Sequence, residues 1–273
     1  MMIRLRTLAL LLTLALLSGC GMLQSVAQSG KLLAPESFGL VPIAPHLYVE
    51  AGTDEATQDR LRADIARAES AIRRAYGSVS ARPTVHACMT EKCYAAFGGR
   101  GSVARVFGQR ILLSTRGLNW HFLAHEWSHA EMSTRLTLLA WKRMPQWFDE
   151  GLAVAISEAP EHSEDHWQFL ISANIPRPSR DELRTYQSLQ QWQAGLHRFG
   201  DDKNFERVNQ GQPSLSPVYA AAGREVRPWL DAVGSAGLLH FIQRMNEGAD
   251  FEAAYEPPIA KPFSANSAKS YSK

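Results

Sequence analysis

Two histidines and a glutamate in the segment 125–129, HEWSH, are the residues of this chain best suited to chemistry. Residues four apart on a helix lie one turn apart on the same face, so His125 and His129 can point at one metal ion. Glu126 leans beside that pair, where its carboxylate can reach a water at the metal and act as a general base. Apolar residues flank the segment, and 122–130 contains no Pro or Gly, which favours a buried helix. The pattern indicates a catalytic zinc site, although a helix that merely carries two histidines has the same spacing.

A catalytic zinc usually has three protein ligands, and the segment 144–153, MPQWFDEGLA, offers the third. Pro145 suits the first turn of a helix, and the apolar residues after it give this helix a buried face. A helix, a connection and a second helix would bring Glu150 back beside the histidines. Two imidazoles, one carboxylate and an open position for water are the usual catalytic arrangement. We therefore predict one Zn²⁺ bound by His125, His129 and Glu150.

Other side chains compete for the third ligand position. The zinc class with a third histidine needs Gly at position 132 and His at position 135, where this chain has Met132 and Arg135. His121 lies one turn before the first ligand, but a stripe of three histidines spans about 12 Å, which is too long for one ion. Asp149 would point about 100° away from the next residue on a helix. We therefore expect His121 and Asp149 to lie in the cleft or behind the ligands and to bind no metal.

Taken together, HEWSH and WFDEGLA resemble the gluzincin metallopeptidases, especially the bacterial peptidase-MA-like group. The resemblance covers roughly residues 105–255. It implies that His125, His129 and Glu150 are the zinc ligands and that Glu126 is the general base.

The resemblance further implies a residue that polarises the substrate carbonyl. In such proteins a Tyr or His from a later region often does this, and Tyr219 is our first candidate, ahead of His240 and His197. A packing role for Tyr219 fits the sequence equally well. The chain departs from thermolysin-like members at Val154, where they carry Asp, and it lacks the G-x-M-E-N element of aminopeptidases. A pocket for a free N-terminus is therefore not expected.

The beginning of the chain predicts where the protein acts. Two arginines precede an apolar run over residues 8–17, which is shorter than the roughly twenty residues that a membrane span needs. Residues 1–19 are thus interpreted as a signal peptide, ending in LSGC, which resembles a bacterial lipobox with Cys20 as the lipidated residue. An ordinary secretory signal is the alternative. Because Gly21 follows and not Asp, we expect a lipid-anchored protein of the bacterial cell envelope, in the outer membrane and facing the periplasm.

Composition favours one catalytic domain behind that anchor. The chain has 29 basic and 27 acidic residues, and removal of residues 1–19 takes away two arginines and no acid, leaving 27 of each. No basic stripe is interleaved with aromatic residues, so no nucleic-acid partner is expected, and no second apolar stretch is long enough to span a membrane. In an oxidising periplasm we expect Cys88 and Cys93 to form a disulfide, with free buried thiols as the alternative.

The order of predicted elements favours an α+β fold, with a small mixed α/β N-terminal lobe, a zincin-type active-site helix and a mainly helical C-terminal lobe. Strands are predicted at 46–50 and 83–87, and a hairpin or one bulged strand at 103–114. A helix is predicted at 54–76, ending at Gly77. The resemblance to gluzincins implies that residues 111–114, just before the metal helix, form an edge strand that lines the cleft and pairs with extended substrate. Residues 20–44 are interpreted as a tether, with packing of 38–43 on the domain as the alternative. Residues 45–256 are interpreted as the gluzincin-like domain and 257–273 as a disordered tail.

The predicted activity is hydrolysis of peptide bonds in envelope peptides or proteins by a zinc-activated water, with Glu126 as the base. Two alternatives stay open: a non-catalytic zinc-binding lipoprotein that acts as a partner-binding module, and an amidase that acts on cell-wall peptide. A structural zinc site needs no base and usually has closed coordination, which argues against the first alternative. The segment 161–166, EHSEDH, holds a second histidine pair, for which an exposed loop or helix start is favoured over a second metal site.

Overall fold

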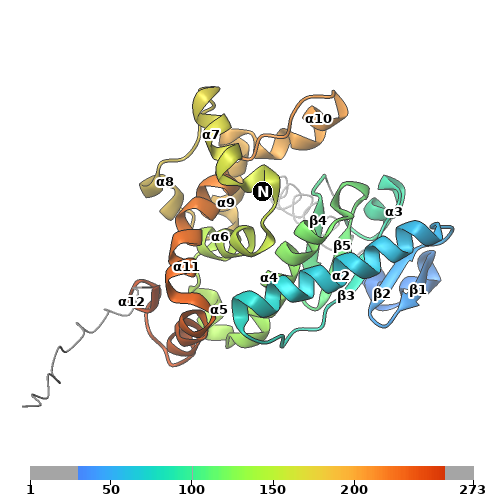
Figure 1. The fold of residues 1–273 in the computed structure, drawn as a ribbon, viewed down its shortest axis with the longest axis horizontal. Helices are drawn as coiled ribbons and strands as arrows, with labels where there is room; N and C mark the ends of the chain where they lie inside the picture. The colour runs from blue at the N-terminus through green and yellow to red at the C-terminus, as the bar shows by residue number, and fades with distance from the viewer. Residues whose placement is uncertain (1–29, 100, 256–273) are drawn as a thin grey trace, which may run out of the picture.

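The computed structural model describes residues 30–99 and 101–255 of the chain. The predicted signal peptide 1–19, the lipidation site Cys20 and the predicted tail 257–273 lie outside these residues. The described part is an α+β fold with a small mixed sheet in its N-terminal lobe and helices in its C-terminal lobe, as predicted (Figure 1). The N-terminal lobe contains η1 (Lys31–Leu33), η2 (Pro35–Phe38), β1 (Leu40–Ala44), β2 (Leu47–Glu50), α2 (Glu55–Tyr76), β3 (Thr84–Ala87), α3 (Glu91–Ala96), β4 (Ala104–Phe107), β5 (Arg110–Leu113), η3 (Thr115–Gly117) and α4 (Trp120–Arg135).

The five strands form one sheet in the order β1-β2-β3-β5-β4. β1 and β2 are antiparallel, β2, β3 and β5 are parallel, and β4 and β5 form an antiparallel hairpin that turns at Gly108 and Gln109. Of the two arrangements predicted for 103–114, the structure has the hairpin. The prediction of an edge strand at 111–114 is wrong, because β5 lies between β3 and β4. The strand that has a free edge and packs against α4 is β4.

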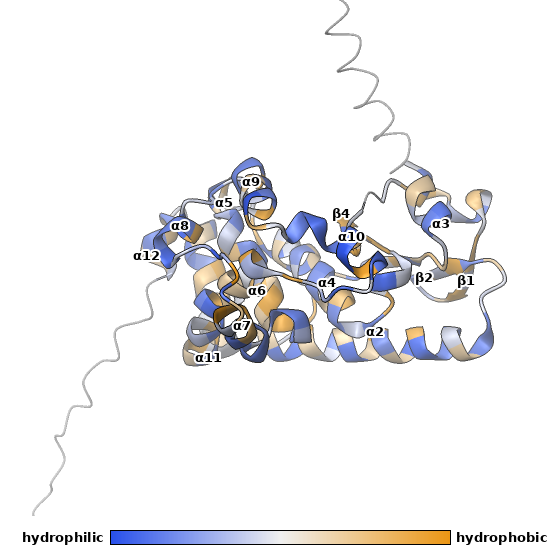
Figure 2. Cartoon of the chain, turned by 90° about the horizontal axis from the view of Figure 1, so that it is seen from above, coloured by the Kyte–Doolittle hydropathy of each residue, from blue (hydrophilic) through white to orange (hydrophobic). Residues whose placement is uncertain are grey.

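Helices and turns cover both faces of the sheet, with α2 and α3 on opposite sides (Figure 2). Val85 belongs to the main core that the sheet forms with α2 and α4. Leu112 belongs to a smaller core on the other face, together with Tyr94 of α3. Cys88 lies in this smaller core and forms a disulfide with Cys93, as predicted. The disulfide therefore fastens α3 to the end of β3.

The fold includes residues 30–44, so the predicted tether over 20–44 is too long. Leu32 and Leu40 are buried in the smaller core, and the carbonyl oxygen of Leu32 accepts a hydrogen bond from Arg110 Nε at 3.2 Å. β1 adds an outer strand to the sheet through its pairing with β2. The predicted domain boundary at residue 45 is wrong because burial of these leucines makes the preceding segment part of the domain.

The C-terminal lobe is built around the contact between α6 and α11. A Cβ atom on Gly151 would lie 2.6 Å from Val226 Cγ2 and 2.7 Å from the carbonyl oxygen of Ala222, so only glycine allows this approach. α11 changes direction at Gly234, where φ is 60°. The lobe contains α5 (Leu138–Arg143), α6 (Gln146–Ser157), η4 (Pro160–His162), α7 (Glu164–Ser172), α8 (Arg180–Arg184), α9 (Leu189–Phe199), η5 (Asp201–Lys203), α10 (Asn204–Asn209), α11 (Pro217–Asn246) and α12 (Phe251–Tyr255).

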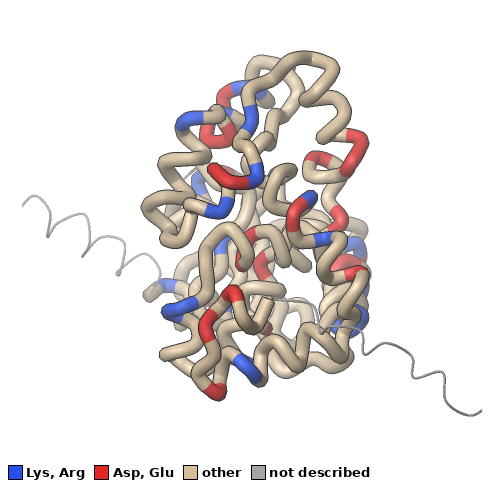
Figure 3. Tube along the Cα trace, turned by 90° about the vertical axis from the view of Figure 1, so that its left-hand side faces the viewer, with Lys and Arg blue, Asp and Glu red and all other residues tan. Residues whose placement is uncertain are grey.

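Charged residues of both signs are interspersed along the trace in Figure 3. Many of them pair locally, such as Arg73 and Glu69, which lie one turn apart on α2 at 2.6 Å. Among the helices of residues 30–99 and 101–255, none is both long and apolar enough to cross a membrane.

Candidate metal centre

Buried hydrogen bonds fix the helix that carries the two histidines. At its beginning, the Asn119 side chain accepts hydrogen bonds from the first free N–H groups of α4. Near its end, the buried Glu131 carboxylate accepts hydrogen bonds from the N–H groups of Ser80 at 2.8 Å and Ala81 at 2.7 Å, and it pairs with Arg135. A buried carboxylate is tolerated when its oxygens are bonded in this way. These contacts tie α4 to the loop that precedes β3 and therefore fix the direction of its histidines.

The three predicted ligands converge between α4 and α6. Their ligand atoms all lie within 4.8 Å of one another, and the side chains are about nine-tenths buried. Glu150 Oε2 is 3.3 Å from His125 Nε2 and 3.7 Å from His129 Nε2. Ligand atoms that bind one tetrahedral zinc at about 2.0–2.2 Å are about 3.4 Å apart. The spacing and the donor set therefore fit a single zinc ion.

Neighbouring side chains hold the outward atoms of two ligands. His129 Nδ1 lies 2.9 Å from Asp149 Oδ2, which fixes the ring orientation and leaves Nε2 for a metal. Gln146 Nε2 donates a hydrogen bond to Glu150 Oε1 at 3.0 Å, which leaves Oε2 toward the histidines. Asp149 thus lies behind the ligands, where it was expected, and Gln146 is a supporting residue that the sequence analysis missed.

The imidazoles and carboxylates of the site shift one another's pKa values in opposite directions. Burial disfavours the charged form of His129, but the carboxylates of Asp149 and Glu150 outweigh it and raise the pKa of His129 well above the usual value. Burial also opposes ionisation of Glu150, but hydrogen bonds from His125 and His129 hold the pKa of this carboxyl well below its usual range. The carboxylates therefore favour positive charge at this point, and a divalent cation would compete with protons for the same atoms.

Glu126 and His125 line a cleft of about 660 Å³, which we call the metal cleft. One wall comes from β4, and the other comes from η4, α9, α10 and the beginning of α11. Glu126 is partly buried, and no described residue forms a hydrogen bond or ion pair with its carboxylate. Burial raises the pKa of Glu126, although the imidazoles of His125 and His129 lower it. The carboxylate is therefore free to accept a proton from a group in the cleft.

The structure separates the three candidates for the carbonyl-polarising residue. Tyr219 lies in the first turn of α11 and lines the cleft, with its ring centroid 6.0 Å from that of His125. His240 is exposed on α11 and does not line the cleft. His197 is also outside the cleft lining, and its exposed ring pairs with Asp202 at 2.8 Å. Of the three, only Tyr219 is near the ligands.

His121 does not support the ligands. Its Nδ1 lies 2.7 Å from the carbonyl oxygen of Ser157, and its ring packs on Trp120. It is absent from the cleft lining and from the converging ligand group. The prediction of a cleft or supporting position for His121 is therefore wrong, because its rotamer directs the ring to the end of α6.

His162 is a cleft residue that the sequence analysis missed. It is 6 % exposed, lines the cleft, and stacks on Tyr219 with a centroid distance of 5.1 Å and an interplanar angle of 20°. The prediction that the segment 161–166 is exposed is therefore wrong for His162. His166 Nε2 instead accepts a hydrogen bond from the N–H of Ser216 at 3.3 Å, so the two histidines of the segment share no site. The spacing of the two histidines in the sequence does not show which of them lines the cleft.

A second group of possible ligand atoms, Glu50, Cys88 and Cys93, lies in the N-terminal lobe. The two sulfurs are joined in the disulfide, and Glu50 Oε2 accepts hydrogen bonds from the N–H groups of Met89 at 2.8 Å and Thr90 at 2.9 Å. Glu50 therefore holds the turn that leads into α3, and the group does not resemble a metal site.

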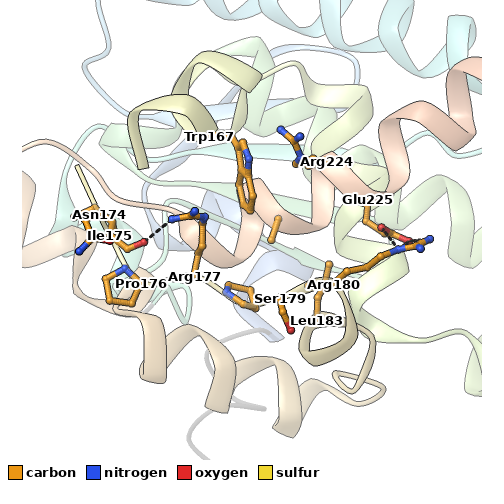
Figure 4. Close-up of a pocket in the computed structure, with 12 residues that line it drawn as sticks. Trp167, Asn174, Ile175, Pro176, Arg177, Ser179, Arg180, Leu183, Arg224 and Glu225 are labelled. Atoms are coloured by element: carbon orange, nitrogen blue, oxygen red, sulfur yellow. Dashed lines mark hydrogen bonds and ion pairs between the residues drawn. The ribbon is translucent and has the colours of Figure 1, made fainter. Parts of the chain in front are cut away.

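A second cavity, of about 680 Å³, shares no lining residue with the metal cleft (Figure 4). We name it the arginine cavity, after Arg177, Arg180 and Arg224. Trp167 lies between two of these, 5.2 Å from Arg177 and 5.1 Å from Arg224. Arg180 donates to Glu225 at 2.8–3.0 Å, Arg177 donates to backbone carbonyls, and Arg224 pairs with a carboxylate of α7. Two of the three guanidinium groups are thus paired with carboxylates, and the third is bonded to the backbone.

Comparisons with protein-family models, with curated proteins and with solved structures found no match to this chain.

Proposed function

We propose that this protein is a zinc-dependent metallopeptidase of gluzincin type. The observation that supports the proposal best is the convergence of His125, His129 and Glu150 beside a partly buried glutamate that has no partner of its own among the described residues. A closed structural zinc site has no need for such a glutamate. We further propose that the protein acts on peptides or proteins of the bacterial cell envelope and is held at the membrane by lipidation of Cys20.

Zinc bound by these ligands would supply a Lewis acid that activates a water and polarises a carbonyl oxygen. Glu126 accepts a proton from the attacking water as its oxygen bonds to the carbonyl carbon. The same carboxyl then gives a proton to the amide nitrogen as the C–N bond breaks. The fixed direction of α4 and the hydrogen bond that His129 Nδ1 donates to Asp149 keep the ligands and the base in position.

Extended substrate is proposed to pair with the free edge of β4, which forms one wall of the cleft. Pairing with this edge would hold a peptide across the front of α4, next to Glu126. Tyr219 on the opposite wall is proposed to contact the carbonyl under attack. A substrate held between the two walls would expose one amide to the base.

The test uses the full chain loaded with zinc and a hydroxamate as a probe of the open metal position. We expect acetohydroxamate to raise the melting temperature, because a ligand that binds only the folded state stabilises it. Incubation with envelope proteins, followed by mass spectrometry of new termini, should then reveal cleavage that is absent with Glu126→Gln. Zinc binding with neither hydroxamate protection nor cleavage would favour a non-catalytic zinc-binding lipoprotein. Cleavage confined to cell-wall peptide would favour an amidase.

A further inference from the structure

His162 is the buried imidazole in the cleft that the ligand set does not use. Its main chain is well held, since its N–H bonds to the carbonyl of Ala159 at 2.9 Å and its carbonyl accepts from Arg227 at 3.3 Å. Its side chain is different. Nδ1 is buried without a hydrogen-bond partner, and the described residues offer no hydrogen bond to Nε2 either.

A purely structural histidine would be expected to bond at least one ring nitrogen, because nearly all buried polar groups in proteins are paired. His166, four residues later, follows that rule through Ser216. His162 instead stacks face to face on Tyr219, whose ring lies edge-on to His125. This stack places an imidazole with no hydrogen-bond partner among the described residues in the lining of the cleft, one ring away from His125.

His162 is not a fourth metal ligand in this arrangement. The group of atoms that lie within 4.8 Å of one another contains His125, His129 and Glu150 but not His162. A zinc bound by the three would therefore keep its fourth position for a water or a substrate oxygen. Burial, together with the nearby His125, lowers the pKa of His162 well below its usual value, so the ring is a neutral donor.

We propose that His162 donates a hydrogen bond to the substrate oxygen that becomes negatively charged during hydrolysis, and that Tyr219 holds the imidazole in place by stacking. Nδ1 is sealed from the cleft, so the donor is the N–H at Nε2. Preorganised donors of this kind act on the charge that develops in the transition state. The inference rests on the proposed peptidase function and assigns this role to a residue of η4.

The experiment compares two probes on the zinc-loaded full chain. Acetohydroxamate reports the open metal position, and phosphoryl-leucinamide reports recognition of a tetrahedral anion. His162→Phe keeps the stack on Tyr219 but removes both nitrogens. We expect its affinity for phosphoryl-leucinamide to fall about ten- to a hundredfold, its affinity for acetohydroxamate to stay within about twofold, and its zinc content to be unchanged. His162→Gln, which retains an N–H donor, should recover part of the loss, and the exposed control His240→Phe should change nothing.

Catalysis should follow the same pattern, with kcat reduced about 10²- to 10³-fold in His162→Phe and KM nearly unchanged. Equal loss of both probes, or loss of neither, would overturn the role of His162. If the wild-type protein fails to bind acetohydroxamate, the proposed function itself is wrong, and the two failures are thereby distinguished.

A measurement on the wild-type protein covers the case in which His162→Phe does not fold. In protein labelled with ¹⁵N-histidine, the Nε2 resonance of His162, identified by its loss in His162→Gln, should shift when phosphoryl-leucinamide binds. It should shift much less with acetohydroxamate. If the Nε2 resonance does not shift when phosphoryl-leucinamide binds, the proposed hydrogen bond is rejected.

Discussion

The metal cleft and the arginine cavity both gather charged side chains, but they organise them in opposite ways. In the arginine cavity each guanidinium bonds to its own neighbours: Arg180 and Arg224 pair with carboxylates, and Arg177 donates to backbone carbonyl oxygens. In the metal cleft the atoms of three side chains face one point, and Asp149 and Gln146 bond to their outward atoms. Ligand atoms that converge while their outward atoms are already bonded are typical of a site prepared for a cation. Charged groups that each bond to separate neighbours are typical of a structural surface.

The largest effect should come from the base. Glu126→Gln removes the proton acceptor but no ligand, so we expect turnover to fall about 10²- to 10⁴-fold while one zinc per chain remains bound. Peptide hydrolysis assays and elemental analysis measure the two quantities. Turnover like that of the wild type would reject Glu126 as the base.

The next largest effect should be on the metal. Glu150→Ala removes the carboxylate that joins the two imidazoles, and we expect zinc to be lost on dialysis. The exposed carboxylate Glu206 on α10 offers a control, since Glu206→Ala leaves the ligand atoms untouched. Unchanged zinc content in Glu150→Ala would count against this residue as a ligand.

Asp149→Asn tests whether the outward atoms matter. The change weakens the acceptor for His129 Nδ1, and loss of such a partner typically costs about 10- to 100-fold in metal affinity. A competition titration with a zinc-binding dye measures the affinity, and Asp165→Asn on the exposed surface of α7 is the matched control. Equal zinc affinities for the two variants would contradict the supporting role.

Asp201 is a buried carboxyl group in the lining of the metal cleft, and unlike Glu150 it has no imidazole or guanidinium among the groups that shift its pKa. Burial raises its pKa to about 8. An unfolded Asp loses its proton near pH 4, so between about pH 4 and 8 the folded state binds more protons, and the free energy of unfolding falls as pH rises. The slope is about 1.4 kcal/mol per pH unit for one proton. Denaturant unfolding at several pH values should show this fall in the wild type relative to Asp201→Asn. Parallel curves would contradict the assignment.

The smallest effect should come from the arginine cavity. Glu225→Gln weakens the ion pairs with Arg180 and Arg184, which bond to it at 2.8 Å. We expect the free energy of unfolding to fall by about 1 kcal/mol, with no change in zinc affinity. A change in zinc affinity would show that the two regions are coupled and would weaken the distinction drawn between them.

Much of the fold was predictable because it depends on local signals. The helix over 54–76 has apolar residues at helical spacing, and the structure places α2 there, capped by Asp54 and stopped at Gly77. The disulfide followed from two cysteines five residues apart. The order of the strands did not follow, because pairing partners are set by packing between distant segments. The edge position therefore fell to β4 and not to β5.

The candidate site divides in the same way. Spacing along α4 and the carboxylate of α6 were sufficient to bring His125, His129 and Glu150 together as predicted. The supporting and wall residues were predicted less well: Asp149 was placed correctly, His121 was not, and Gln146 and His162 were missed. The positions of these side chains depend on how each helix is rotated about its own axis when it packs against its neighbours. The type of a residue alone does not reveal that rotation.

What the sequence determined by itself is the chemistry on offer: a helix with two imidazoles one turn apart, a glutamate between them and a carboxylate on a later helix, because helical periodicity is local. Only the tertiary structure decided which side chains surround these metal-binding and catalytic groups. The close packing of α6 on α11 at Gly151, and the turn at η4 that brings His162 against Tyr219, depend on contacts between segments distant in the chain. Those contacts determine which nitrogen is bonded and which is left open to the cleft.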